Sequence, residues 1–429
     1  MTEHAIAILM ITFAVLIVIG LNIVYAIGLS AMITAFVIGL PLEMIVQSMI
    51  TQLNSFSLLA VPFFILAGSI MGVGGITDRL VALAKSIVGW MRGGLAHVNV
   101  VASMFFGGIS GSAAADTASI GAILIPMMVK DGYDNDFSTS ITMASSVQGL
   151  LIPPSHNMVI YAVAAGGVSV GQLFMGGMIP GILLGVALMI YCYFVSVKRN
   201  YPKGDRFSFA EFADAFRKAI WGLGTVLIVV VAVLTGIVTP TESAAIACIY
   251  ALFVSAFIYR EMTWEKLVFV FRDTIRTLST ILIIACSSAA FGWLVAYLQI
   301  PKLMLDSLLL ISHNKVILLL IVNIMLLLIG TFMNMVPAIL ITTPILLPVV
   351  TSIGISPVQF GVVMILNLGI GLITPPVGTL LYIGSGLSGL SMLRLSKAML
   401  PFYGVMVGVL LLLTYIPQLS TWLPSVVIP

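Results

Sequence analysis

The chain has 429 residues, of which 61% are hydrophobic and only 8% are charged, and its formal net charge is +3. Soluble domains carry about 25% charged residues, so the composition excludes a water-soluble enzyme or binding domain as the body of the protein. It indicates an all-α polytopic membrane protein, with a lipid bilayer around it and no nucleic-acid partner. The three cysteines, Cys192, Cys248 and Cys286, lack the paired spacing of a disulfide framework or a metal site.

Apolar runs of about 20 residues, the length that crosses a bilayer, recur along the chain. In the first half we expect spans over 5–21, 22–40 and 51–74, then a Gly/Ser-interrupted pair over 95–129, a proline-broken segment over 137–167 and a span over 172–197. The stretches 78–92 and 264–276 interleave charges with Trp90 and Trp264, which predicts two amphipathic helices at the membrane surface.

The second half repeats this order of segments. We expect spans over 217–237, 240–259 and 277–300, an interrupted pair over 315–350, a broken segment over 357–386 and a last span over 399–422. Thr239, Pro240 and Glu242 have the spacing of a helix N-terminus closed by a capping box, so we assign Glu242 a structural role.

Two short stretches share one pattern: GLLIPPSHN at 149–157 and GLITPPVGT at 371–379, separated by 222 positions. The same offset, without a gap, relates glycines and prolines that precede them: Gly108 and Gly330, Pro126 and Pro348, Gly132 and Gly354. The side chains between these anchors differ freely. This pattern predicts a duplication that retains the residues required by the backbone.

If each interrupted pair is a re-entrant hairpin, each half crosses the bilayer five times, and the odd number inverts the second half. With an external N-terminus, the inner side collects 16 of the 18 Lys and Arg residues, all except Lys302 and Lys315. Both termini are therefore expected on the outer side. If each interrupted pair instead crossed the bilayer twice in full, every loop would stay on the same side of the membrane. The positions of Lys and Arg therefore do not distinguish the two cases, and the prediction of re-entrance rests on the Gly, Ser and Asn residues at the midpoints of the pairs.

The prolines of the two breaks have a specific consequence for the backbone. Pro153 deprives the carbonyl of Gly149 of its helical partner, and Pro375 does the same to Gly371. Such carbonyls are costly in hydrocarbon unless they line protein or a cavity. Two matched sets of uncharged oxygens are suited to a cation site, as in inverted-repeat transporters.

The midpoints of the interrupted pairs supply further oxygens. The first reads GGISGSAAAD (107–116) and the second GTFMNMVPA (330–338). A proline kink or a Gly/Ser tip alone is often only a bend or a close helix contact; both, duplicated in one order, favour a functional site. Asp116 is the one acid inside a predicted membrane segment, and it either ligates an ion, takes part in proton coupling or steadies the first hairpin by a hydrogen bond.

Two other classes of protein share single features of this sequence. GISG at 108–111 has the GxSG pattern of intramembrane serine proteases, with His156 or His97 as a base, but four-residue motifs match easily. Such a protease needs no second hairpin and no second break. A channel is the other alternative, although paired hairpins suit alternating access better than a continuous pore.

Several stretches together resemble one family: VPFFILAGSIM, GGISGSAAADTASIG, IPPSHNMVIY, TPTESAA, GTFMNMVPAILITTPILLPVV and NLGIGLITPPVGTLLYI. They are similar to the large, DctM-type membrane subunit of TRAP (tripartite ATP-independent periplasmic) transporters, over essentially the whole chain. The resemblance implies a non-enzymatic, Na⁺-driven permease of a bacterial inner membrane without an organic cofactor. It implies as partners a separate small membrane subunit and a periplasmic binding protein that delivers a small carboxylate, such as sialic acid or a C4-dicarboxylate.

The resemblance also implies an elevator-type division. Residues 1–94 and 198–314 would form the scaffold, and residues 95–197 and 315–429 the moving transport domain. One Na⁺ site would use Gly108, Ser110, Ser112, Gly149, Ile152 and Ser155; the second would use Gly330, Asn334, Gly371, Thr374 and Val377. The substrate would contact Ser110, Ser112, Asn157, Asn334 and Thr379. A stand-alone Na⁺/anion symporter of the same superfamily is the nearest alternative.

Overall fold

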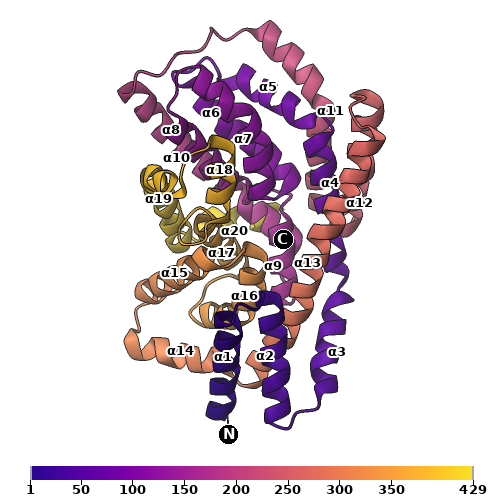
Figure 1. The fold of residues 1–429 in the computed structure, drawn as a ribbon, viewed down its shortest axis with the longest axis vertical. Coiled ribbons are helices and arrows are strands. Elements are labelled where there is room, and N and C mark those ends of the chain that lie inside the picture. Colours follow the sequence, from indigo (N-terminus) through magenta and orange to yellow (C-terminus); the bar gives the residue numbers. More distant parts are fainter. Residues whose placement is uncertain (1, 428–429) are drawn as a thin grey trace.

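The computed structural model describes residues 2–427, and this part of the chain is helical throughout, with one isolated antiparallel bridge between Arg92 and Lys203. Figure 1 shows an elongated bundle in which α1–α3 lie at one end and α5 and α11 at the other. By length and composition, eight described helices could cross a bilayer, and a ninth crossing results if the pair α4–α5, bent by 72°, is one span.

The N-terminal group consists of α1 (Thr2–Val18), α2 (Ile23–Val37), α3 (Leu42–Leu53), a 3₁₀ turn (Phe56–Leu59), α4 (Ala60–Val73) and α5 (Ile76–Val88). The bend between α4 and α5 falls at Gly75, whose φ of 78° lies in the left-handed region that favours glycine. The expected span over 51–74 was therefore wrong at its start. Asn54 and Ser55 interrupt it, because their side chains favour turns over helix.

The next group holds α6 (Gly94–Ser110), α7 (Ala113–Lys130), α8 (Asn135–Gly149), α9 (His156–Ala165) and α10 (Val170–Lys198). It is followed by α11 (Phe209–Leu234), α12 (Pro240–Phe253), a π-helical turn (Val254–Ile258), α13 (Trp264–Tyr297) and α14 (Ile300–Ile311). The capping box at α12 is confirmed: the hydroxyl of Thr239 accepts from the Glu242 amide, and the Glu242 carboxylate accepts from the Thr239 amide at 2.7 Å.

A separate surface helix over 264–276 was a wrong prediction. Helix α13 runs through this stretch and the following span for 34 residues, because no proline or glycine occurs before Gly292. Helix α14 was not predicted at all. It starts after a left-handed turn at Gln299, and its own apolar run of 12 residues is too short to indicate a span.

The last group holds α15 (Lys315–Phe332), α16 (Met335–Ser352), α17 (Pro357–Leu372), α18 (Thr379–Ser388), α19 (Met392–Tyr415) and α20 (Gln418–Val427). The last span was expected to continue to residue 422, but α19 ends before Pro417, which cannot continue the helical hydrogen bonds. Helix α20 then turns back and packs on α10.

Buried side chains gather in a few clusters. The largest unites α6–α10 with α15–α19 and includes residues from α2, α4, α11, α12 and α13. A second joins α1, α2 and α3 to the end of α13, and a third joins α4, α5 and α11 to α12. In Figure 1 the helices α3, α4, α12 and α13 accordingly run along one side of the α6–α9 and α15–α18 region.

Candidate ion and solute site

Two structural units contain the residues singled out by the sequence. Unit 1 comprises α6–α9 (residues 94–165), with tip 1 at 107–112 and break 1 at 149–157. Unit 2 comprises α15–α18 (residues 315–388), with tip 2 at 330–335 and break 2 at 371–379. In both units the helix ends within four residues before the double proline, and the peptide bond between the two prolines is cis.

Tip 1 lies directly against break 1. A Cβ atom built on Gly107 would lie 2.2 Å from the Cα atom of Gly149, and one built on Gly111 would lie 2.9 Å from the backbone nitrogen of His156. Gly111 has a φ of 58°, so it also needs the left-handed freedom of glycine. Glycines at these positions let two backbones approach to the distance at which one ion can contact both.

Break 1 contains polar groups without partners. The hydroxyl of Ser155 is fully buried and makes no hydrogen bond. Among the described residues, we find no amide that donates to the carbonyl of Gly149. The amide of Asn157 donates to the carbonyl of Gly111 at 2.9 Å and so ties the break to the tip. Ile152, half-buried, lies beside Gly108.

The hydroxyls of tip 1 are partly engaged. Ser112 is the N-cap of α7, and its Oγ accepts from the amide of Ala115 at 3.3 Å. The Oγ of Ser110 accepts from the amide of Ser112 at 3.3 Å. No Ser–His hydrogen bond of the kind that a serine protease needs is present between Ser110 and His156 or His97 in the described chain.

Asp116 lies one turn behind the tip, in the contact between α6, α7 and α8. Its side chain is fully buried; Oδ1 accepts from the hydroxyl of Ser103 at 3.1 Å, and Oδ2 has no partner. The hydroxyl of Ser103 also lies within hydrogen-bond distance of the Ser145 hydroxyl, at 3.1 Å. The hydroxyl of Ser145 in turn donates to Oδ1 of Asn99 at 3.0 Å. Asp116 therefore belongs to a buried polar network that joins three helices, close to Gly149.

Tip 2 and break 2 also touch. A Cβ atom on Gly371 would lie 2.4 Å from the carbonyl carbon of Gly330. The amide of Val377 donates to the carbonyl of Thr331 at 3.2 Å. Asn334 is the N-cap of α16, at the offset of 222 from Ser112; its side chain is exposed and makes no capping bond.

The oxygens of break 2 are more fully engaged than we expected. The carbonyl of Gly371 accepts from the amide of Thr374 at 3.0 Å, because the chain tightens into a final turn after the helix ends. Pro375 thus removes the helical partner of this carbonyl, as expected, but the amide of Thr374 takes its place, so the carbonyl is not free. The hydroxyl of Thr374 donates to Ile370 at 2.7 Å, and the hydroxyl of Tyr403 donates to the carbonyl of Ile373.

The structure also reveals polar residues that sequence reasoning missed. Helix α3 carries four neutral polar residues on one face, at Gln47, Ser48, Thr51 and Gln52. Their i, i+1, i+4, i+5 spacing was a readable signal. A search for membrane spans does not find it, because the stretch begins between the expected spans 22–40 and 51–74.

Comparison with known proteins decides the family. Residues 10–419 match the family model of the tripartite ATP-independent periplasmic transporter, DctM component. The chain belongs to this family. The TRAP large component is a transporter permease, so the chain is a multi-pass membrane protein and not an enzyme, and the protease alternative is excluded.

Relatives and solved structures agree with this assignment. The isethionate TRAP transporter permease protein of Oleidesulfovibrio alaskensis is 40% identical over 95% of this chain, which spans 64% of that longer protein. The sialic acid TRAP transporter large permease protein of Vibrio cholerae is 39% identical, over 88% of each chain. The crystal structure of the YdaH transporter of Alcanivorax borkumensis has a TM-score of 0.64 at 16% identity, over 87% of this chain and 88% of that chain, a likeness of fold alone.

Proposed function

We propose that the chain is the large permease subunit of a Na⁺-coupled importer of small organic acids. The observation that carries this proposal is the buried, unpartnered hydroxyl of Ser155, whose backbone lies against Gly111 where tip 1 meets break 1. A Na⁺ ion in transit needs several oxygen ligands, and neutral hydroxyl and carbonyl oxygens leave the site uncharged once the ion departs.

Unit 1 supplies the first Na⁺ site, through Gly108, Ser110, Ser112, Gly149, Ile152 and Ser155. Unit 2 supplies the second, through Gly330, Asn334, Gly371, Thr374 and Val377. At break 2 the carbonyl of Gly371 retains one lone pair after it accepts from Thr374, so it can still contact an ion. Asp116 supports the first site from behind through its contact with the Gly149 region.

The solute lies between the two tips, near Ser110, Ser112, Asn157, Asn334 and Thr379. None of these side chains is cationic, so the anionic group of the solute is held by helix N-termini and hydroxyls. Helices α7, α9, α16 and α18 all begin at a tip or a break. Relatives are named for isethionate and for sialic acid, whose anionic groups differ: one is a sulfonate and the other a carboxylate. A site made of helix N-termini and hydroxyls can bind either group.

Transport follows an inverted-repeat, elevator-type cycle in this proposal. The two hairpins and two broken helices move as one body, within residues 95–197 and 315–429, against the scaffold formed by residues 1–94 and 198–314. The largest buried cluster takes most of its residues from α6–α10 and α15–α19, as one moving body requires, and the rest from the scaffold helices packed against them. We place the protein in a bacterial inner membrane with both termini outside, beside a small membrane subunit and a periplasmic binding protein.

The test is uptake into proteoliposomes that hold this permease and its small subunit. With loaded binding protein outside, we expect uptake only under an inward Na⁺ gradient. Replacing external Na⁺ by K⁺ or choline should abolish it, and so should omission of the binding protein. Uptake that persists without Na⁺ would refute the coupling, and uptake without the binding protein would favour a stand-alone symporter.

A further inference from the structure

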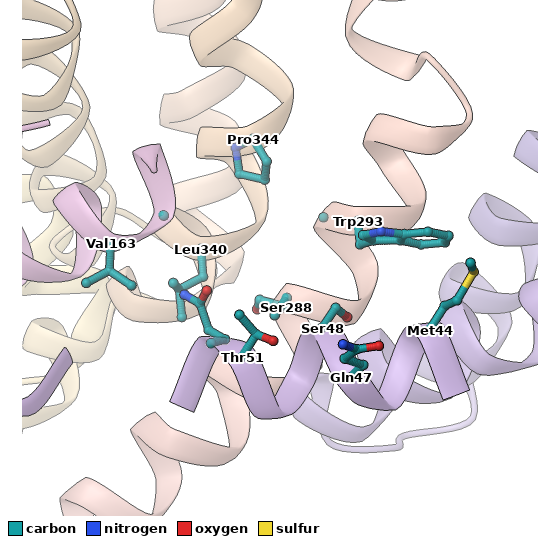
Figure 2. A pocket seen from close by; sticks show the side chains of 13 residues that line it. Met44, Gln47, Ser48, Thr51, Val163, Ser288, Trp293, Leu340 and Pro344 are labelled. Atoms are coloured by element: carbon teal, nitrogen blue, oxygen red, sulfur yellow. The ribbon is translucent and has the colours of Figure 1, made fainter. Parts of the chain in front are cut away.

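A cavity of about 540 Å³ lies between α3, α9, α13 and α16, apart from the two tips (Figure 2). Helix α3 forms one wall, with Gln47 and Thr51 directed toward the other helices. Helix α13 contributes Ser288 and the ring of Trp293, and α16 contributes Leu340 and Pro344. Its volume lies in the range of about 300–1,000 Å³ that is typical of small-molecule sites.

The sequence of α3 explains why its polar face meets this cavity. A neighbouring face, about 100° around the helix from the middle of the polar one, carries Ile45, which is fully buried in the cluster with Phe291 and Leu294 of α13. Burial of that apolar face fixes the rotation of the helix about its axis. The four polar residues of α3, spaced to share one face, are then turned toward the space between α13 and α16.

Ser288 provides an independent sign of a ligand. Its side chain is only 4% exposed, it lines the cavity, and its hydroxyl has no hydrogen-bond partner. A buried hydroxyl without a partner is costly unless something bound supplies one. The adjacent Ser287 is equally buried but faces α2, where a Cβ atom on Gly28 would lie 3.0 Å from its Oγ.

The cavity is connected to the proposed solute site by two helices. Helix α9 begins at break 1 and reaches the cavity at Val163, about 10 Å along its axis. Helix α16 begins at tip 2 and reaches it at Leu340, about 7 Å along. The opposite wall, α3 and α13, belongs to the proposed scaffold. The cavity thus lies between the scaffold and the moving body, beyond the tips.

We propose that this cavity is a second, outer subsite for the transported solute and that it selects hydroxyl-rich organic acids. Its described lining offers amides, hydroxyls and one indole ring, and contains no charged side chain. Such groups recognise the hydroxyls and the C–H face of a sugar acid and give little preference to a bare dicarboxylate or sulfonate. This inference rests on the function proposed above and names the class of solute for that same path.

Cysteine protection tests the subsite in the complete complex. Ser288→Cys and Thr51→Cys are each made in a Cys286→Ala background and reconstituted with the small subunit. A charged, membrane-impermeant methanethiosulfonate is added with gluconate, N-acetylneuraminate, succinate or isethionate. We expect gluconate or N-acetylneuraminate to slow modification about fivefold or more at concentrations well above their dissociation constants, by mass action. Succinate and isethionate should slow it less than twofold, and Ser287→Cys should not react.

The outcomes separate this inference from the proposed function. The inference would be overturned if none of the four acids slowed modification, or if succinate slowed it as much as gluconate and N-acetylneuraminate do. It would also be overturned if lipid filled the cavity and neither cysteine reacted with the reagent. If Ser288→Cys fails to fold, the protection of Thr51→Cys, at an exposed position of α3, tests the same expectation. Na⁺-driven uptake is measured in the same vesicles with loaded binding protein outside: uptake without protection refutes only the subsite, whereas no uptake refutes the proposed function.

Discussion

Units 1 and 2 share one backbone plan but differ in how their polar groups are used. In unit 1, Pro153, Pro154 and Ser155 are buried, and a hydroxyl and a carbonyl lack partners. In unit 2, Pro375, Pro376 and Val377 are exposed, and the carbonyls of the break already accept hydrogen bonds. The shared plan comes from glycines and prolines, and the difference comes from the side chains between them.

This difference assigns different tasks to the two units. A buried site with unsatisfied oxygens is preorganised for an ion, because binding satisfies groups that otherwise cost free energy. An exposed site whose oxygens already have partners gains less from an ion and remains accessible to a larger solute. We therefore infer that unit 1 sets most of the Na⁺ affinity, and that unit 2 contributes more to solute access.

The glycine contacts are the feature that the units share, and breaking them should have the largest effect. Gly107→Ala and Gly371→Ala each place a Cβ atom within 2.4 Å of opposing backbone. We expect each to lose on the order of 1–3 kcal/mol of stability, the usual cost of overpacking, and to abolish uptake. Thermal unfolding of the purified variants measures this loss. Gly408→Ala on α19, with open space around it, is the control and should be unchanged.

The ion ligands should separate the units. Ser155 and Val377 occupy equivalent positions at the offset of 222. Ser155→Ala removes an oxygen available to Na⁺, so the Na⁺ concentration for half-maximal uptake should rise about 10- to 100-fold, because one bond to a charged group is worth about 1.5–3 kcal/mol. Val377→Ala should leave it unchanged. Equal effects would show that the two units contribute alike.

The bond between Asn157 and Gly111 should have an intermediate effect. Asn157→Ala leaves the Gly111 carbonyl buried without its donor, at a cost of about 1 kcal/mol or somewhat more. We expect uptake of the solute to fall about fivefold with the protein still folded. Thr379→Val, at the equivalent position of unit 2, should reduce uptake less than twofold. A larger loss in Thr379→Val would contradict the role given to the bond between Asn157 and Gly111.

The smallest effect is expected where water can replace a lost partner. Tyr403→Phe removes the hydroxyl that donates to the carbonyl of Ile373 at break 2. Because the neighbouring prolines are exposed, the stability loss should not exceed about 1 kcal/mol, and Na⁺ dependence should stay normal. A strong rise in the Na⁺ requirement of this variant would show that break 2 is as finely positioned as break 1.

Much of this architecture was predictable because prolines and glycines impose local rules. Helices α8 and α17 end within four residues before Pro153 and Pro375, and the tips turn where glycine permits it. The length of α13 was not predictable from its charges, because a charged surface can continue into an apolar span without a break. The turn that occupies the carbonyl of Gly371, and the exposure of break 2, depend on tertiary contacts that local patterns do not contain.

The central claim is that unit 1 holds a Na⁺ ion, and ion-dependent thermal unfolding of the purified permease tests it most directly. A ligand that binds only the folded state raises its stability by mass action. Na⁺ should therefore raise the unfolding temperature of the unmodified protein more than equal concentrations of K⁺ or choline do. Ser155→Ala should lose most of this Na⁺-specific rise, and Val377→Ala should keep it. An equal rise in Ser155→Ala and in the unmodified protein, or no Na⁺-specific rise in either, would contradict the account.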